Sequence, residues 1–270
     1  MGMMIALAGN PNCGKTTLFN ELTGSKQHVG NWPGVTVDKK EGVYKKNKEV
    51  VILDLPGTYS LSPYSAEEIV ARDYIVKDKP DAVINIVDGA SIERNLYLSL
   101  QIMETRIPMV IAMNMMDEVE ARGDKIDCQK LSQVLGVPVV PIGARSGRGL
   151  TELMDAALRA AEKHEKPERM SLFGEDLENA IAGIADVLGD RDSDESWWKA
   201  IKLVENDQVV AETLEPAKAS SVKELVDSAN KSADGDAEAK IADIRYQYIG
   251  RIVGECVRKA NRGHVETKSD

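Results

Sequence analysis

The sequence predicts an α/β fold in which a mostly parallel sheet carries helices on both faces and is followed by a small all-helical domain. Two patterns predict this fold. Residues 1–166 alternate short, nearly continuous apolar runs with amphipathic stretches, as expected for strands buried on both faces of a parallel sheet. After the charged stretch around Pro167 these runs stop, and apolar residues recur at helical spacing. We therefore expect a first domain over residues 1–166 and a second over 167–270.

The elements of the first domain follow in chain order. Parallel strands are expected at five apolar runs, residues 3–7, 50–53, 82–87, 109–113 and 137–142. Residues 35–44 interleave polar and apolar side chains, so we expect them to add an antiparallel edge strand beside residues 50–53.

The second domain is expected to contain helices only. The last helix is expected over about residues 239–261, because one of its faces carries four apolar residues, Ile241, Ile244, Tyr248 and Ile252. Ordinary core is the simplest interpretation of this stripe, and a partner surface is the alternative. Residues 228–238, rich in Ala, Asp, Lys and Ser, are expected to form an exposed loop.

Composition narrows the function classes. The chain has 270 residues, 43% of them apolar, with no apolar run long enough to span a bilayer and no secretory signal pattern at its start, so we expect a cytosolic, soluble chain. Its formal charge is −10, of which residues 167–270 contribute −8 (22 acidic against 14 basic), and this argues against nucleic-acid binding. Three separated cysteines and three isolated histidines form neither a disulfide framework nor a transition-metal cluster.

A phosphate-binding loop is predicted directly after the first apolar run. Eight consecutive residues fit GxxxxGK[ST], namely Gly9, Asn10, Pro11, Asn12, Cys13, Gly14, Lys15 and Thr16, and Thr17 opens the helix that follows. Glycines let backbone N–H groups turn onto phosphate oxygens, Lys15 reaches the β- and γ-phosphates, and the Thr16 hydroxyl binds Mg²⁺. The alternative is a glycine-rich turn that only resembles this loop. Cys13 is expected to be a small buried filler rather than a reactive thiol.

Two further motifs close later strands. Asp54 and Gly57 form a DxxG motif, in which the carboxylate holds Mg²⁺ through water and the Gly57 amide senses the γ-phosphate. Asn114 and Asp117 form an NxxD motif, and a fixed carboxylate at Asp117 accepts hydrogen bonds from guanine N1–H and its exocyclic amine. Adenine lacks this pair of donors, so ATP is disfavoured.

The predicted base site has two less specific parts. Met115 replaces the lysine usual in NxxD motifs and is expected to cover a face of the base. Gly143, Ala144 and Arg145 follow the last strand, where the Ala144 N–H is expected to be available to guanine O6. Taken alone, this tripeptide is better interpreted as an ordinary β–α turn.

Residues 28–37 lie between the phosphate loop and Asp54. Two glycines, a proline and an exposed Trp32 predict a mobile loop, with Thr36 placed to join the magnesium ligands once a γ-phosphate is present. A structural turn that buries Trp32 is the alternative.

Together these motifs resemble a known family. GNPNCGKTTLFN, LTG, VGNWPGVTV, DLPGTYSL and NMMD resemble the cytosolic GTPase domain of the ferrous iron transport protein FeoB family. The resemblance implies a Ras-like P-loop GTPase that binds GTP and GDP with Mg²⁺, followed by a helical domain. It also implies a transmembrane iron-permease domain in the same polypeptide, on whose cytoplasmic side this module would lie. Residues 266–270 resemble the stretch just before that membrane region, and assembly into homo-oligomers stays open.

The resemblance also implies how hydrolysis is assisted. Thr58 stands where Ras-like enzymes place the segment that carries a water-orienting glutamine, and the nearest arginine to a switch is Arg72, so slow hydrolysis is expected. Related GTPases with asparagine at the Asn12 position bind K⁺ through its side-chain carbonyl and two backbone carbonyls, which map to Gly30 and Trp32. The expected catalytic set is Lys15, Asn12, Thr36 and Gly57. The alternative for Asn12 is a loop residue bonded to its own backbone.

Two other function classes share parts of this pattern. A ribosome-assembly or RNA-modifying GTPase has the same first-half motifs but would use its second half to hold RNA, which the acidic second half opposes. A P-loop kinase or ATPase is opposed by Asn114 and Asp117.

Overall fold

The computed structural model describes residues 2–25, 27–62 and 65–260. The sheet-containing part consists of β1 (Met3–Gly9), α1 (Lys15–Thr23), β2 (Gln27–Asn31), β3 (Asp38–Val43), β4 (Val50–Asp54), α2 (Ala66–Asp73), the π-helix η1 (Tyr74–Asp78), β5 (Ala82–Asp88), the 3₁₀-helix η2 (Gly89–Ser91), α3 (Ile92–Glu104), β6 (Met109–Asn114), α4 (Met116–Ala121), β7 (Lys125–Ile126), α5 (Cys128–Leu135), β8 (Val139–Pro141) and α6 (Leu150–Glu162). The remainder consists of α7 (Glu175–Leu188), α8 (Asp194–Val204), α9 (Gln208–Ala211), α10 (Pro216–Ser232), α11 (Ala237–Cys256) and β9 (Val257–Arg258).

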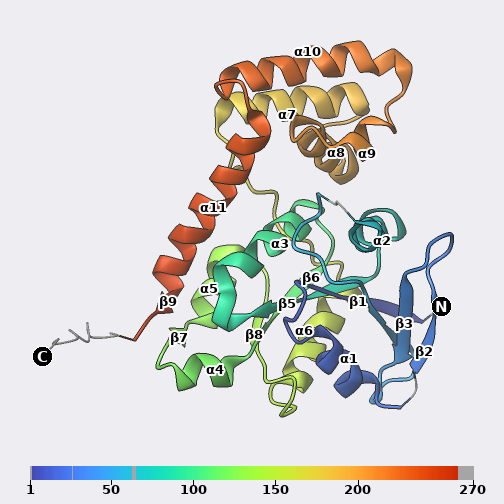
Figure 1. The fold of residues 1–270 in the computed structure, drawn as a ribbon, viewed down its shortest axis with the longest axis vertical. Coiled ribbons are helices and arrows are strands. Elements are labelled where there is room, and N and C mark those ends of the chain that lie inside the picture. The colour runs from blue at the N-terminus through green and yellow to red at the C-terminus, as the bar shows by residue number, and fades with distance from the viewer. Residues whose placement is uncertain (1, 26, 63–64, 261–270) are drawn as a thin grey trace, which may run out of the picture.

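Seven strands form one sheet in the order β2-β3-β4-β1-β5-β6-β8 (Figure 1). The strands from β4 to β8 are parallel, and β3 and β2 are antiparallel to their neighbours. Leu7 of β1 is paired with Asp54 of β4, and Asp88 of β5 with Asn114 of β6. The carboxyl ends of these strands therefore meet at one edge of the sheet, where ligands of open α/β sheets bind.

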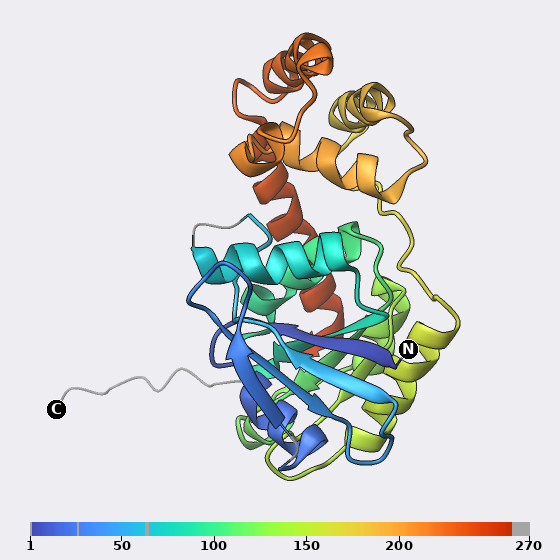
Figure 2. The same ribbon diagram turned by 90° about the vertical axis from the view of Figure 1, so that its right-hand side faces the viewer.

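Helices cover both faces of this sheet, as predicted (Figures 1 and 2). On one face, β1, β4 and β5 pack against α3, α5 and the lower half of α11, with Leu96, Leu131 and Ile252 buried. On the other face the same strands pack against α1 and α6, with Phe19 and Leu153 buried. The described residues up to Glu162 are called the sheet body below.

The helices α7, α8, α9 and α10 form the helical body, which has its own core around Ile181, Ile201 and Val222. The helix α11 belongs to both bodies (Figure 1). Ile241 near its start is buried in the helical core, and Ile249 and Ile252 near its end are buried in the sheet core. The apolar stripe predicted on this helix is therefore core.

The end of α11 is attached to the sheet body by a second, two-stranded antiparallel sheet of β7 and β9. Asp127 N–H donates to the Cys256 carbonyl at 2.8 Å and extends this pairing. Among the helices of the described ranges, none is both long enough and apolar enough to cross a membrane.

The predicted loop over residues 28–37 is wrong in its first half. Residues 27–31 form β2, which pairs with β3 and becomes the edge strand, so the predicted strand at 35–44 is realised as β3 but lies one place inside the edge. Trp32 is only 8% exposed, and its ring meets the Tyr74 ring edge to face with centroids 5.4 Å apart. The prediction of an exposed tryptophan is therefore wrong, because η1 supplies an apolar surface for it.

The predicted exposed loop over residues 228–238 is also wrong. The helix α10 continues to Ser232 and α11 begins at Ala237, so only four residues connect them. Ala229 and Ala233 are buried against the helical body. The last helix ends at Cys256 rather than near 261, and residues 261 and 266–270 lie outside the described residues.

Candidate functional site

The predicted phosphate loop connects β1 to α1 at the carboxyl edge of the sheet. Asn12 and Gly14 have left-handed backbone angles, with φ of +64° and +94°, so the chain turns sharply twice before α1. A Cβ atom on Gly14 would lie 2.2 Å from the Asn114 side-chain nitrogen. Only glycine fits this position, and its lack of a side chain lets the phosphate loop touch the NxxD motif.

Asn114 joins three predicted segments. It is 4% exposed, its Nδ2 donates to the Cys13 carbonyl at 3.0 Å, and its Oδ1 accepts from the Ala144 N–H at 3.1 Å. The phosphate loop, the NxxD motif and the 143–145 turn are thereby tied together. The Ala144 amide was expected to be free, whereas here it is occupied by Asn114.

A cavity of about 400 Å³ lies where these segments meet. It is lined by Gly14, Thr17, Asn114, Met115, Asp117, Glu118, Gly143, Ala144, Arg145 and Ser146. The structure thus brings all six residues predicted for base recognition to one cavity. The helix α4 begins directly after Met115, whose φ is +60°, and Asp117 lies exposed in its first turn. Glu118 and Ser146 were not predicted, because only their adjacency to the motifs marks them in the sequence.

The predicted magnesium residues lie beside the phosphate loop. Asp54 ends β4, and its carboxylate forms an ion pair with the Lys15 ammonium, with both side chains largely buried. Thr16 lies in the first turn of α1. These hydroxyl and carboxylate oxygens are the hard donors that Mg²⁺ prefers. Thr36 is exposed in the turn between β2 and β3.

Gly57 and Thr58, which follow Asp54, contact the phosphate loop. A Cβ atom on Gly57 would lie 3.3 Å from Pro11, and the Thr58 N–H donates to the Gly9 carbonyl at 3.1 Å. The Gly57 amide is therefore next to the loop predicted to hold phosphates. Thr58 is 1% exposed, and its hydroxyl donates to the Ser60 carbonyl at 2.6 Å.

The predicted potassium ligands lie on two segments. Asn12 is exposed in the phosphate loop, Gly30 pairs with Lys39 within β2 and β3, and Trp32 follows β2. The Trp32 carbonyl accepts from the Val35 N–H at 3.3 Å.

Cys13 is 1% exposed. Burial raises the pKa of its thiol to about 11, and the nearby Lys15 offsets only part of that rise. The prediction of a buried filler is confirmed.

The Arg72 side chain pairs with carboxylates outside the phosphate loop. It is 2% exposed, and its guanidinium pairs with Asp207 at 3.1 Å and with Asp73 at 3.5 Å. It therefore ties α2 to the helical body and is not free to act on a phosphate.

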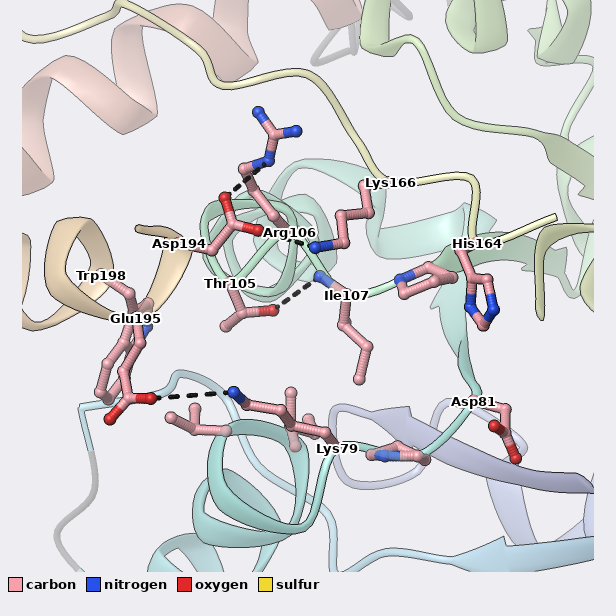
Figure 3. A pocket seen from close by; sticks show the side chains of 14 residues that line it. Lys79, Asp81, Thr105, Arg106, Ile107, His164, Lys166, Asp194, Glu195 and Trp198 are labelled. Carbon is pink, nitrogen blue, oxygen red and sulfur yellow. Dashed lines mark hydrogen bonds and ion pairs between the residues drawn. The ribbon is translucent and has the colours of Figure 1, made fainter. Parts of the chain in front are cut away.

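A larger cavity, about 570 Å³, lies elsewhere (Figure 3). Its walls come from the segments before β5 and β6, the α6–α7 connection and the start of α8, so it lies at the amino edge of the sheet. Asp194 pairs with Arg106 of the sheet body at 3.1 Å and with Lys166 of the α6–α7 connection at 2.9 Å, and Glu195 pairs with Lys79 of the sheet body at 3.8 Å. We assign this cavity to the junction of the bodies and the chemistry to the smaller one.

Comparison with known proteins identifies the family. The family model described as ferrous iron transport protein B matches residues 3–157, and the FeoB cytosolic helical domain matches residues 173–258. The chain is 40% identical to the Fe(2+) transport protein A/Fe(2+) transporter FeoB fusion protein of Porphyromonas gingivalis, covering 95% of this chain and 32% of that protein. It is 38% identical to the Fe(2+) transporter FeoB of Escherichia coli K12, covering 93% of this chain and 33% of that protein. The chain thus spans about a third of the length of these curated relatives.

Solved structures agree as well. A GDP-bound mutant of the S. thermophilus FeoB G-domain has a TM-score of 0.89 and 41% identity, covering 95% of this chain and all of that one. The mGMPPNP-bound protein from S. thermophilus has a TM-score of 0.83 and 41% identity, covering 97% of this chain and 99% of that one. The second half matches the FeoB helical domain. With family models matching both halves, the chain belongs to the FeoB family and comprises its Ras-like G domain and its helical domain.

Proposed function

We propose that this chain binds GTP and GDP and hydrolyses GTP to GDP and phosphate, as the nucleotide-responsive module of a longer ferrous iron transporter. The observation that carries the proposal is the cavity that Asp117 lines together with Gly14 of the phosphate loop, beside Asn114, whose side chain donates to the Cys13 carbonyl of that loop. Solved relatives bound to GDP and to mGMPPNP support it.

The residues divide the work of phosphoryl transfer. Lys15 offsets charge on the β- and γ-phosphates, and the Gly57 N–H donates to the γ-phosphate. Thr16, Thr36 and Asp54 would hold Mg²⁺, which neutralises the phosphate oxygens when bound. The buried Thr58 hydroxyl is already bonded to Ser60, so it does not orient water. We therefore expect slow intrinsic hydrolysis.

Base selectivity tests the proposal. We expect calorimetry in Mg²⁺ to show GDP and GTP binding at least about 100-fold tighter than ATP, because two hydrogen bonds to a carboxylate contribute about 1.5 to 3 kcal/mol each. Asp117→Ala should remove most of that preference. Glu118→Ala removes a carboxylate from the same cavity wall and should keep it. Absence of binding heat with every guanine nucleotide contradicts the function, and equal losses in both variants contradict the role of Asp117.

We propose further that K⁺ stimulates hydrolysis through Asn12, Gly30 and Trp32. A cation there would offset charge that develops between the β- and γ-phosphates. Asn12→Gly suits the test because φ is +64° and glycine adopts that angle without strain. We expect several-fold faster phosphate release in K⁺ than in Na⁺ for the parent and for the Asn47→Ala control, and no difference for Asn12→Gly. Equal rates of the parent in both salts contradict this proposal.

The remaining expectations concern the longer protein. We propose that the module serves a membrane-spanning iron permease in the same polypeptide, from the cytoplasmic side of the cell membrane. Iron uptake by cells that carry the full-length gene with Asp117→Ala tests this link, and uptake equal to the parent contradicts it. Homo-oligomer formation stays a prediction that light scattering can test. The chain is also predicted not to bind nucleic acid, and a filter-binding assay can test this.

A further inference from the structure

The segment Gly57–Ser62, which begins with the proposed γ-phosphate sensor, makes three hydrogen bonds to distant parts of the fold, and the Arg94 guanidinium of α3 also lies 4.4 Å from the centroid of the Tyr59 ring. The Thr58 N–H donates to the Gly9 carbonyl at 3.1 Å, and the Leu61 N–H donates to Gln101 Oε1 of α3 at 2.7 Å. These two hydrogen bonds lie within the sheet body. The third comes from the helical body, where Lys202 Nζ of α8 donates to the Ser62 hydroxyl at 3.1 Å.

Lys202 is held in one place by its surroundings. Its residue is 0% exposed, and its Nζ also donates to Glu205 Oε2 at 3.0 Å. Glu205 is bound on its other side by Arg245 of α11, which is itself 0% exposed and donates to both carboxylate oxygens of Glu104 at 2.9 Å. A buried charge is tolerated only when its partners are fixed, so this chain of ion pairs allows the Lys202 ammonium little freedom.

A second contact joins the same corner of the helical body to the end of α2. Arg72 donates to Asp207, which caps the start of α9 by accepting from the Val210 N–H. Ser62 and Arg72 are therefore both attached to the α8–α9 corner. The charged contacts around the large cavity of Figure 3 are more exposed, with Lys79 and Lys166 about half in solvent, and they involve no residue of Gly57–Ser62.

We propose that Lys202 is a positioning residue for GTP hydrolysis, supplied by the helical body: through Ser62 it fixes the segment that carries the Gly57 amide. The inference rests on the proposed GTPase function. Lys202 does not line the nucleotide cavity, so its loss should lower kcat, through poorer placement of Gly57, and leave KM nearly unchanged.

The variants separate positioning from folding. Ser62→Ala removes only a hydroxyl from a half-buried residue, whereas Lys202→Met removes a buried charge and is checked by thermal unfolding. Lys199→Met is the matched control, because Lys199 lies on the same helix and pairs with Glu195 at 2.7 Å on the exposed side. Lys202→Arg keeps the donor and should restore activity.

Two readouts are needed. We expect Ser62→Ala and Lys202→Met each to lower kcat about 5- to 10-fold with KM within twofold, the double variant to be no slower than the slower single variant, and Lys199→Met to match the parent. Three results would overturn the proposal. They are a double variant whose loss of kcat is the product of the two single losses, an unchanged kcat in Ser62→Ala, and a loss of kcat in Lys199→Met equal to that in Lys202→Met.

The second readout needs no nucleotide. Hydrogen exchange of the amides of residues 58–62 should be faster in Ser62→Ala and Lys202→Met than in the parent and Lys199→Met. Unchanged exchange overturns the anchoring. A parent that binds no GTP, or does not hydrolyse it, contradicts the proposed function, and exchange then still decides whether Lys202 holds the segment.

Discussion

Cys13 shows how burial outweighs a neighbouring charge. It lies in the phosphate loop two residues before Lys15, a position that favours a thiolate, yet burial raises its pKa to about 11. Burial likewise raises the pKa of Cys128 to about 11 and that of Cys256 above its usual range. All three thiols are therefore neutral at physiological pH.

Alkylation measures this directly. At pH 7.5 a thiol with a pKa near 11 has roughly 100-fold less thiolate than an ordinary one, so iodoacetamide should label native Cys13 and Cys128 at least about tenfold more slowly than the urea-unfolded chain. Gln129→Cys places a thiol next to Cys128 on the exposed side of α5 and should be labelled fast. Rapid native labelling of Cys13, followed by mass spectrometry of its peptide, would show that the loop opens or that the thiol is charged.

Individual residues of the site were predictable to different extents. Gly14, Asn114 and Asp117 lie in motifs whose spacing fixes their chemistry, and the structure brings them to one cavity. The environment of Trp32 was not predictable, because Tyr74 is distant in sequence and nothing local marks it as a partner. The hydrogen bond from the Ala144 N–H to Asn114 was not predictable either, because a sequence motif indicates which groups contact a ligand but not which of these groups bond to each other.

Among the elements, strands were easier to predict than helix ends. Runs such as residues 82–87 are apolar throughout, and every residue of β5 up to Val87 is buried. The end of α10 lacks such a signal. Its buried residues there are alanines, which bury little surface but favour helix strongly, so the composition of residues 228–232 resembled a loop.

The start of α11 is fixed by an N-cap at Asp236, which lies within the residues that were predicted to form a loop. Asp236 Oδ1 accepts from the Ala239 N–H at 2.9 Å. Because a lost N-cap costs about 1 kcal/mol, we expect Asp236→Ala to lower the free energy of unfolding by about that amount, and Asp236→Ser to restore most of it. Lys240→Ala, an exposed change on the same helix, should stay within about 0.5 kcal/mol. Urea unfolding followed by circular dichroism compares the three, and a Lys240→Ala loss as large as that of Asp236→Ala would refute a specific cap.

The whole molecule is two bodies held together by contacts between residues far apart in sequence. Arg245 and Glu104 are separated by 141 residues, and Lys202 and Ser62 by 140. The sequence predicts a sheet part and a helical part because each has its own periodicity. It does not predict their junction, since a buried ion pair has no periodicity and an isolated Arg or Glu is most often exposed.

Acid should weaken this junction. Burial alone would raise the pKa of Glu205, but attraction by Lys202 and Arg245 outweighs it and lowers the pKa from 4.5 to about 2. A carboxyl whose pKa is lower in the folded state binds protons more readily when unfolded. Its contribution to stability is therefore complete above about pH 4.5 and is lost as the pH falls toward 2.

Glu205→Gln tests this at the scale of the whole protein. At pH 7 the variant leaves Lys202 and Arg245 with less negative charge, so we expect a loss of about 3 to 5 kcal/mol in the free energy of unfolding. That difference from the parent should stay constant from pH 7 to about 4.5 and shrink below it, because the parent then protonates Glu205 on unfolding. Urea titrations at intervals down to pH 3 measure it, with the exposed Glu212→Gln as control, for which no such pH-dependent difference is expected. A difference between parent and Glu205→Gln that is the same at pH 3.5 as at pH 7 would show that the Glu205 carboxylate does not bind the two bodies through its charge.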